Sequence, residues 1–268
     1  MPPLQDRSTW LHGDSAHCLQ PPSSPRPWRL VLLGPPGVGK GTQSELLAAA
    51  LGACPLSTGA LFRSGYDHSL YPGSAMAEAL DRVNHGQLVP DDVVLSLIRN
   101  RRTCLRCPGG FLLDGFPRTL TQACALDGLL ALEHVQLDAV LCYDLPVARL
   151  VERMSGRRVC PRCHAVYHTS LRPPRYDGIC DQCSWSLAQL PDDYPDAVKT
   201  RLAAYAAAAA QVAQHYQRQE LVLHVDADGS PDEILRRTFA ALSQRGCRLP
   251  TASAASPSRL ESCCCSLT

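Results

Sequence analysis

The 268-residue sequence has no apolar segment approaching the roughly 20 residues that a membrane-spanning helix needs. It also has no basic run, because 26 Lys and Arg are balanced by 25 Asp and Glu, which leaves a formal net charge of +1. A near-neutral chain of this kind lacks the charge footprint of a nucleic-acid-binding protein. We also see no internal repeat. The length favours one domain with elaborations, or two small ones, with enough residues to bury a full core.

Cysteine, in contrast, is abundant, with fourteen residues. Four form a metal-binding pattern, three are adjacent at 263–265, and most of the others lie in apolar runs. This distribution indicates a reducing compartment rather than a disulfide framework, so we expect a cytoplasmic protein. A mitochondrial presequence is the alternative, although acidic residues and prolines near the N-terminus count against it. Residues 1–27 and 249–268 lack periodicity and are rich in small residues and proline, which predicts disordered tails around a domain at 28–248.

A glycine-rich loop follows the first apolar run of the domain. Leu30–Leu33 is long enough for a buried strand, Gly34–Thr42 holds four glycines and two prolines, and a helical pattern follows. Strand, loop and helix in this order are typical of a phosphate-binding loop, in which backbone N–H groups and the helix N-terminus hold phosphates. Lys40 can reach the β- and γ-phosphates of a nucleotide. Because Gly41 replaces the usual Ser or Thr, we expect Mg²⁺ to be held by phosphate oxygens, water and an acidic residue from elsewhere.

Four further apolar runs alternate with helical patterns, at residues 54–56, 111–113, 139–143 and 220–225. The alternation predicts an α/β fold with a parallel sheet covered by helices on both faces. Asp114 follows the run at 111–113, which places its carboxylate at the carboxyl edge of the sheet, where such sheets bind ligands. We expect Asp114 to supply the acidic contact to Mg²⁺, through water, since Mg²⁺ dehydrates reluctantly. A helix N-cap is the alternative role.

Residues 159–190 interrupt the alternation with little helical pattern. Two C-x-x-C pairs, separated by sixteen residues, lie in this insertion: Cys160, Cys163, Cys180 and Cys183. Four thiolates can surround Zn²⁺ tetrahedrally and leave no open position, so we expect a structural metal that supplies folding energy to the insertion. Cys104 and Cys107 form another C-x-x-C without a second pair, and no role is predicted for them.

The loop GPPGVGKGTQ, the segments LSTGALFRSG and HGQLVPDD, the stretch LLDGFPRT and the two cysteine pairs together resemble the adenylate kinase family in its long form with a zinc-binding lid. The resemblance covers residues 29–243. It implies a P-loop kinase core with a five-stranded parallel sheet, an AMP-binding part near 57–89 and a zinc lid near 156–193. The implied reaction is Mg·ATP + AMP ⇌ 2 ADP, with ATP and AMP as partners, Mg²⁺ and structural Zn²⁺ as cofactors, and a monomer as the expected state.

The resemblance also implies the site residues. The candidate catalytic residues are Lys40, Asp114, Arg157 and Arg201. The ATP site is implied at Gly37, Val38, Gly39, Lys40, Gly41, Thr42, Arg153, Val166 and Tyr167. The AMP site is implied at Thr58, Arg63, Gln87, Leu88, Val89, Gly115, Phe116, Pro117, Arg118, Gln122 and Arg201. The match of Gln122 to the adenine edge favours AMP over pyrimidine monophosphates.

The sequence departs from the family pattern at two positions. Ala60 stands where the family usually has Asp, and Leu190 stands where the family has a further arginine of its phosphate clamp. These departures leave a second hypothesis open, a catalytically weakened nucleotide-binding or zinc-lidded interaction protein. A GTP:AMP phosphotransferase is a third, because the donor-base contacts of the family are largely made by backbone. The intact loop, Asp114 and the arginines directed at phosphate favour an active AMP kinase.

Overall fold

A computed structural model describes residues 26–64, 75–163 and 165–246. A central sheet of five strands contains β1 (Trp28–Leu33), β2 (Cys54–Ser57), β3 (Gly110–Asp114), β4 (Ala139–Asp144) and β7 (Val222–Asp226). The strand order is β2-β3-β1-β4-β7, and each neighbouring pair is parallel. The predicted five-stranded parallel sheet is confirmed. The last strand begins two residues later than expected, because Glu220 adopts a φ of 58° in the turn before it.

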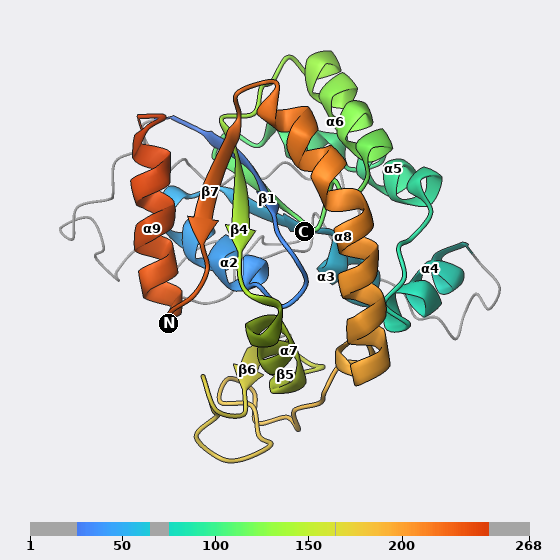
Figure 1. The fold of residues 1–268 in the computed structure, drawn as a ribbon, viewed down its shortest axis with the longest axis vertical. Coiled ribbons are helices and arrows are strands. Elements are labelled where there is room, and N and C mark those ends of the chain that lie inside the picture. Colours follow the sequence, from blue (N-terminus) through green and yellow to red (C-terminus); the bar gives the residue numbers. More distant parts are fainter. Residues whose placement is uncertain (1–25, 65–74, 164, 247–268) are drawn as a thin grey trace, which may run out of the picture.

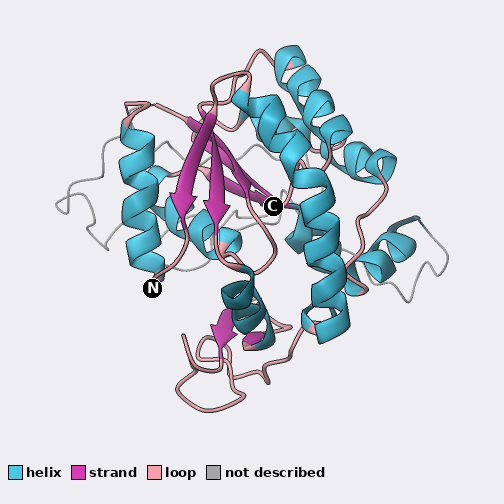
Figure 2. Ribbon diagram, in the orientation of Figure 1, coloured by secondary structure: helices cyan, strands magenta, loops and turns pink. Residues whose placement is uncertain are grey.

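Helices cover both faces of this sheet (Figures 1 and 2). One face packs against α2 (Lys40–Leu51) and α9 (Pro231–Ser243), and the other packs against α5 (Asp91–Arg99), α6 (Leu120–Leu132) and α8 (Pro195–Gln217). Alternate residues of β1 serve the two faces: Leu30 and Leu32 belong to the cluster under α2 and α9, whereas Val31 belongs to the cluster under α5, α6 and α8. All three are fully buried, as expected for the central strand of a parallel sheet.

Two insertions project from the core. Helices α3 (Thr58–Ser64), α4 (Ala75–Asn84) and α5, with the 3₁₀ helix η1 (Arg102–Arg106), lie between β2 and β3. The second insertion follows α7 (Val147–Ser155) and contains an antiparallel pair, β5 (Arg157–Val159) and β6 (Val166–His168), before the 3₁₀ helix η2 (Pro191–Asp193). The first insertion includes most of the part near 57–89 that the resemblance assigns to AMP, and the second includes the part near 156–193 that it assigns to the lid; both assignments stay predictions.

The carboxyl ends of the strands meet at one edge, and β4 and β7 point toward α7 and the second insertion (Figure 1). The loop between β1 and α2 begins with Gly34, at φ 144°, where a Cβ would lie 2.6 Å from the carbonyl oxygen of Tyr143. Only glycine fits this close approach. The loop ends at Gly39, at φ 104°, which caps the N-terminus of α2. Since β3 pairs with β1, Asp114 lies beside this loop.

The predicted tails lie almost entirely outside the described residues, which begin at Arg26 and end at Gly246. None of the helices in the described ranges is both long and apolar enough to cross a membrane.

Candidate active site

Two adjoining cavities lie at the carboxyl edge of the sheet. The larger, of about 910 Å³, is bounded by the glycine-rich loop, the lid and α8. It is lined by these predicted site residues: Gly37, Gly39, Lys40, Gly41, Thr42, Leu88, Asp114, Gly115, Pro117, Arg118, Arg153, Arg157, Val166, Tyr167 and Arg201. The smaller, of about 40 Å³, is lined by Thr58, Gln87, Leu88, Val89, Gly115, Arg118, Gln122 and Arg201. Because Arg118 and Arg201 line both, the two cavities meet at a pair of guanidinium groups.

Lys40 opens α2 and turns back over the glycine-rich loop. Its Nζ donates hydrogen bonds to the carbonyl oxygens of Gly34 at 2.7 Å and Pro35 at 3.0 Å. Loss of solvation lowers the pKa of Lys40 to about 8; the Asp114 carboxylate opposes this shift, and the positive charges of nearby arginines add to it. The pKa of Lys40 is therefore set first by its burial and then by the charged residues around it.

Arg157 and Arg201 are held by two buried carboxylates. Arg157 donates from Nε and Nη2 to the two oxygens of Asp193, each at 2.6 Å. Arg201 donates from Nη1 to the carbonyl oxygen of Asp192 at 2.9 Å, and the same nitrogen lies 3.1 Å from the Asp192 carboxylate and 3.4 Å from that of Asp193. Burial lowers the pKa of Arg201 to about 10. These two aspartates therefore neutralise two arginines of the cavity.

Asp114 ends β3 and faces the larger cavity. One of its oxygens, Oδ2, accepts a hydrogen bond of 3.2 Å from the hydroxyl of Ser57. A Cβ added to Gly41 would lie 3.8 Å from the same oxygen, so the start of α2 lies directly beside the carboxylate. A carboxylate next to a phosphate-binding loop has the oxygen chemistry that Mg²⁺ prefers, and it fits a water-mediated metal contact.

The smaller cavity begins at the junction of β3 and α6. The Thr58 hydroxyl donates to the carbonyl oxygen of Asp114 at 3.3 Å, and Arg118 Nε donates to the carbonyl oxygen of Gly115 at 2.8 Å. Gly115 has a φ of 81°, and a Cβ there would lie 2.8 Å from the Thr58 hydroxyl. Loss of solvation lowers the pKa of Arg118, although its guanidinium is open to the cavities.

The amide of Gln122 is held in one orientation. Its Oε1 accepts from the backbone N–H of Arg118 at 2.8 Å, and its Nε2 donates to Asp91 Oδ1 at 2.7 Å. The other oxygen of Asp91 accepts from the Thr119 hydroxyl at 2.8 Å. Asp91, the first residue of α5, is not among the site residues predicted from the sequence. The available signal was the pair of aspartates, Asp91 and Asp92, after Pro90. This pair could not indicate a contact with Gln122, which lies 31 residues further along the chain.

The remaining predicted residues contribute in different ways. Arg153 donates from Nη1 to the carbonyl oxygen of Val38 at 3.0 Å and from Nη2 to those of Ala227 and Gly229 at 2.9 and 3.2 Å. The side chains of Val38 and Phe116 are buried in the core, so only the backbone of these two residues can contact a nucleotide. The side chain of Arg63 lies outside the described part of the structure.

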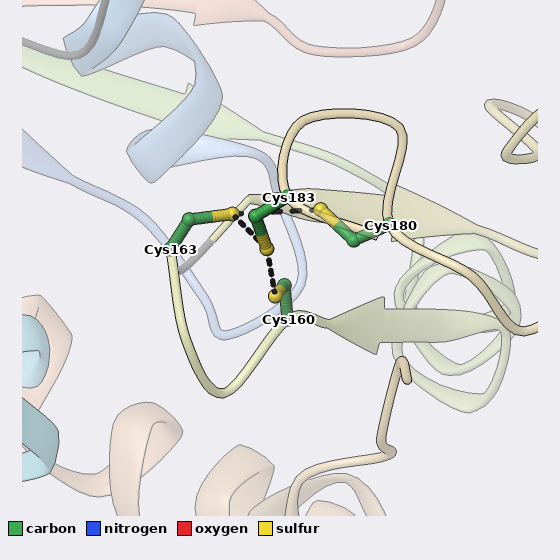
Figure 3. Close-up of side chains that lie close together, drawn as sticks. All are labelled: Cys160, Cys163, Cys180 and Cys183. Carbon is green, nitrogen blue, oxygen red and sulfur yellow. Dashed lines mark hydrogen bonds between the residues drawn. The ribbon is translucent and has the colours of Figure 1, made fainter. Parts of the chain in front are cut away.

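The four lid cysteines gather around one point (Figure 3). Their sulfurs all lie within 4.8 Å of one another, with separations of 3.4 Å for Cys160–Cys183 and for Cys163–Cys180. Cys160 and Cys180 are fully buried, and the hydroxyl of Tyr167 lies 3.5 Å from the Cys180 sulfur. Four convergent thiols in a segment with a small core fit a tetrahedral Zn²⁺.

Comparisons with known proteins agree with this geometry. A model of the adenylate kinase family matches residues 32–221. The chain belongs to the adenylate kinase family. It is 39% identical over 216 residues to the adenylate kinase of Carboxydothermus hydrogenoformans, which covers 81% of this chain and 100% of that protein. It is 42% identical to those of Anaeromyxobacter sp. and Streptomyces coelicolor, over 214 and 219 residues, which cover 80% and 81% of this chain and 99% of each relative.

Both departures from the adenylate kinase pattern lie on the wall of the larger cavity. Ala60 lines it from α3, and Leu190 lines it from the end of the lid, beside the Asp192 and Asp193 that hold the arginines. Arg172 of the lid lines the same cavity. An apolar side chain thus replaces a cation where the lid faces the phosphate-binding loop.

Proposed function

We propose that this protein is an adenylate kinase that transfers the γ-phosphoryl group of Mg·ATP to AMP and releases two ADP. The observation that supports this proposal most directly is the pair of adjoining cavities, one at the glycine-rich loop and one at Thr58 and Gln122. Arg118 and Arg201 line both of them. Nucleotides bound in the two cavities would bring their phosphates together at these guanidinium groups. Family membership supports the same reaction.

In this proposal the protein supplies position and charge. An oxygen of the AMP phosphate forms a bond to the γ-phosphorus while the bond to the β,γ-bridging oxygen breaks, so one ADP forms on each side. Lys40, Arg118, Arg157 and Arg201 neutralise the oxygens of the transferring group. The carboxylates of Asp192 and Asp193 fix the last two arginines before substrate arrives, which reduces the reorganisation needed during transfer. A guanidinium has five N–H donors, and Arg157 uses two of them on Asp193.

Mg²⁺ is proposed to bind with ATP and to be oriented by Asp114 through water. When bound, the ion would neutralise negative charge on the phosphates of ATP. Asp114 therefore contributes with two groups. Its carboxylate faces the glycine-rich loop, and its carbonyl oxygen positions the Thr58 hydroxyl.

The lid is proposed to hold one structural Zn²⁺ on Cys160, Cys163, Cys180 and Cys183. A site of four thiolates leaves no position for substrate, so the metal shapes the lid and takes no part in transfer. We further propose that the protein acts in a reducing, cytoplasmic compartment, because the four lid cysteines can bind zinc only in the reduced form, and that it acts as a monomer.

Gln122 supports AMP as the acceptor. With its amide fixed by Arg118 and Asp91, Nε2 keeps one N–H to donate to a purine ring nitrogen, and Oε1 keeps a lone pair for the adenine amino group. A base of the wrong pattern would leave these polar atoms unpaired, which is a strong basis for discrimination.

A coupled assay of ADP formation tests the function with ATP or GTP as donor and AMP, UMP or CMP as acceptor. The expected result is fast turnover with ATP and AMP and loss of turnover in Lys40→Met. Comparable turnover with UMP or CMP would contradict the acceptor assignment. A faster reaction with GTP than with ATP would make the protein a GTP:AMP phosphotransferase, and binding of ATP and AMP without turnover would make it an interaction protein.

A further inference from the structure

The side chain of Gln43 links the helix that follows the glycine-rich loop to the start of the last helix. Gln43 is the fourth residue of α2 and is only 1% exposed. Its Nε2 donates a hydrogen bond of 2.9 Å to the carbonyl oxygen of Pro231, the first residue of α9, 188 positions further along the chain. We propose that Gln43 is a positioning residue for the donor nucleotide, and that it acts through the loop between β7 and α9.

Packing alone does not account for an amide at position 43. Within the described residues, the Oε1 atom of Gln43 is buried and has no hydrogen-bond partner. A buried acceptor of this kind costs stability, which an unbranched apolar side chain of the same length would avoid. The contribution of the amide is therefore its one hydrogen bond, which holds the end of the β7–α9 loop against α2.

Arg153 contacts the same loop. Its Nη2 donates to the carbonyl oxygens of Ala227 and Gly229, which lie between β7 and α9. Its Nη1 donates to the carbonyl oxygen of Val38 in the glycine-rich loop. Two of the three acceptors that orient this guanidinium therefore belong to the β7–α9 loop. A loop that Gln43 no longer holds would release Arg153, which is one of the residues predicted to bind ATP.

These residues lie on the donor side of the site. Gln43, Arg153 and Gly229 all line the larger cavity, and none of these three lines the smaller one. The proposed function, on which this inference rests, assigns the donor to the larger cavity and the acceptor to the smaller. Loss of the Gln43 hydrogen bond should therefore weaken binding of the donor and leave binding of the acceptor unchanged, because only the donor meets the loop that becomes less ordered.

Steady-state kinetics and calorimetry of Gln43→Met test the proposal on the full-length, zinc-loaded protein. Methionine has the length of glutamine and cannot donate to Pro231. We expect the KM and the Kd for Mg·ATP to rise about 3- to 10-fold, the equivalent of one neutral hydrogen bond, with kcat and the KM for AMP changed by less than about twofold. Ser44→Ala is the matched control and should change none of these values. It removes a neighbouring buried hydroxyl that has no hydrogen-bond partner among the described residues.

The split between the two substrates separates positioning from a structural role. A lower Tm with an unchanged Kd for Mg·ATP, or an equal rise in the KM values for ATP and AMP, would overturn the proposal. The Kd does not depend on turnover. A wild type that binds Mg·ATP but forms no ADP would therefore refute the proposed function, while the Kd of the variant still decides the role of Gln43. If Gln43→Met does not fold, Gln43→Asn replaces it, since this amide is one methylene too short to reach Pro231.

Discussion

Arg157, at the start of the lid, donates two hydrogen bonds of 2.6 Å to the two carboxylate oxygens of Asp193, at its end. The Asp193 side chain is fully buried, and Arg201 of α8 lies 3.4 Å from the same carboxylate. One buried acid therefore joins both ends of the lid to the helix that follows it. Burial raises the pKa of Asp193 and the two arginines oppose that shift, so the carboxylate depends on its partners.

Asp193→Ala should destabilise the protein, because it leaves Arg157 and Arg201 without this buried counter-charge. Removing one partner of a buried ion pair costs about 3–5 kcal/mol, and this value is an upper bound here because Arg157 keeps 24% of its side chain exposed. Urea unfolding measures the loss. Asp196→Ala, a fully exposed aspartate on the next helix, is the matched control and should unfold like the wild type. Equal stability of the two variants would show that the pair is not structurally important.

Lys40 should make ATP binding depend on pH. Its pKa in the free protein is about 8, below the ordinary lysine value, and bound phosphates would raise that pKa again. The protonated form binds phosphate, so the Kd for Mg·ATP should rise as pH passes above about 8, by up to about tenfold per pH unit until the pKa of the complex is reached. Calorimetric titrations between about pH 7 and pH 9 measure this change.

Lys40→Arg is the control for that titration, since a guanidinium stays charged across the range. It should bind Mg·ATP with little pH dependence. A wild-type Kd that is constant over the same range, or an equal rise in Lys40→Arg, would show that Lys40 is not the titrating group.

Asp91→Ala should weaken recognition of the acceptor base without direct contact between residue 91 and the nucleotide. Loss of the Asp91 oxygen frees Gln122 Nε2 and lets the amide rotate. We expect the KM for AMP to rise roughly 5- to 30-fold, the equivalent of one ordered hydrogen bond, with kcat little changed. The preference for AMP over UMP should fall in parallel. Asp92→Ala, at the exposed neighbouring position, should leave both unchanged; a similar loss in that variant would indicate damage to α5 instead.

Cys180→Ser should remove the proposed zinc while the core stays folded, because the sheet and its helices bury their own apolar surface. Elemental analysis of protein purified without chelator should give one zinc per wild-type chain and much less in the variant. Limited proteolysis should then cleave the lid first. Cys124→Ser is the control and should retain its zinc. A wild-type protein without zinc would exclude the site, and unfolding of the whole variant would show that the lid and the core are not separable.

Leu190→Arg should accelerate the reaction. A cation facing the transferring phosphoryl group in a dry site is worth about 10²–10³ in turnover, so part of that factor should be gained in kcat with smaller effects on KM. Leu190→Met preserves volume and should change neither. Arg172→Ala tests whether another lid arginine already fills this role, since Arg172 lines the cavity while the backbone N–H of Arg175 donates to Asp181 in an exposed turn.

An unchanged kcat in Leu190→Arg together with loss of activity in Arg172→Ala would mean that the clamp has moved within the lid. If neither variant affects kcat, the proposed position of the lid over the phosphates is wrong.

The sequence predicted those features that are encoded by a pattern of neighbouring residues. The short apolar runs located all five strands, since a strand buried on both faces has few polar residues, and the spacing of the lid cysteines predicted their convergence. It did not predict the partners of the site residues. The contacts of Asp91 with Gln122 and of Asp193 with Arg157 join positions 31 and 36 residues apart. Such contacts depend on how elements pack, which no local pattern encodes.

The sequence motifs also did not predict which of their side chains are buried. Val38 and Phe116 lie within stretches typical of nucleotide contact, yet both side chains fill the core beneath the cavities. A motif contains the residues that shape a loop as well as those that touch its ligand, and the sequence alone does not separate the two.

Transfer of an isotopic label tests the central claim most directly. The protein is incubated with ATP labelled at the γ-phosphate and with unlabelled AMP, and the products are separated before the label is located. We predict that the label moves to the β-phosphate of ADP formed from AMP, and that the transfer disappears when AMP is omitted or Lys40 is replaced by Met. Label found only in inorganic phosphate, or label that stays in ATP while both nucleotides bind, would contradict phosphoryl transfer between the two cavities.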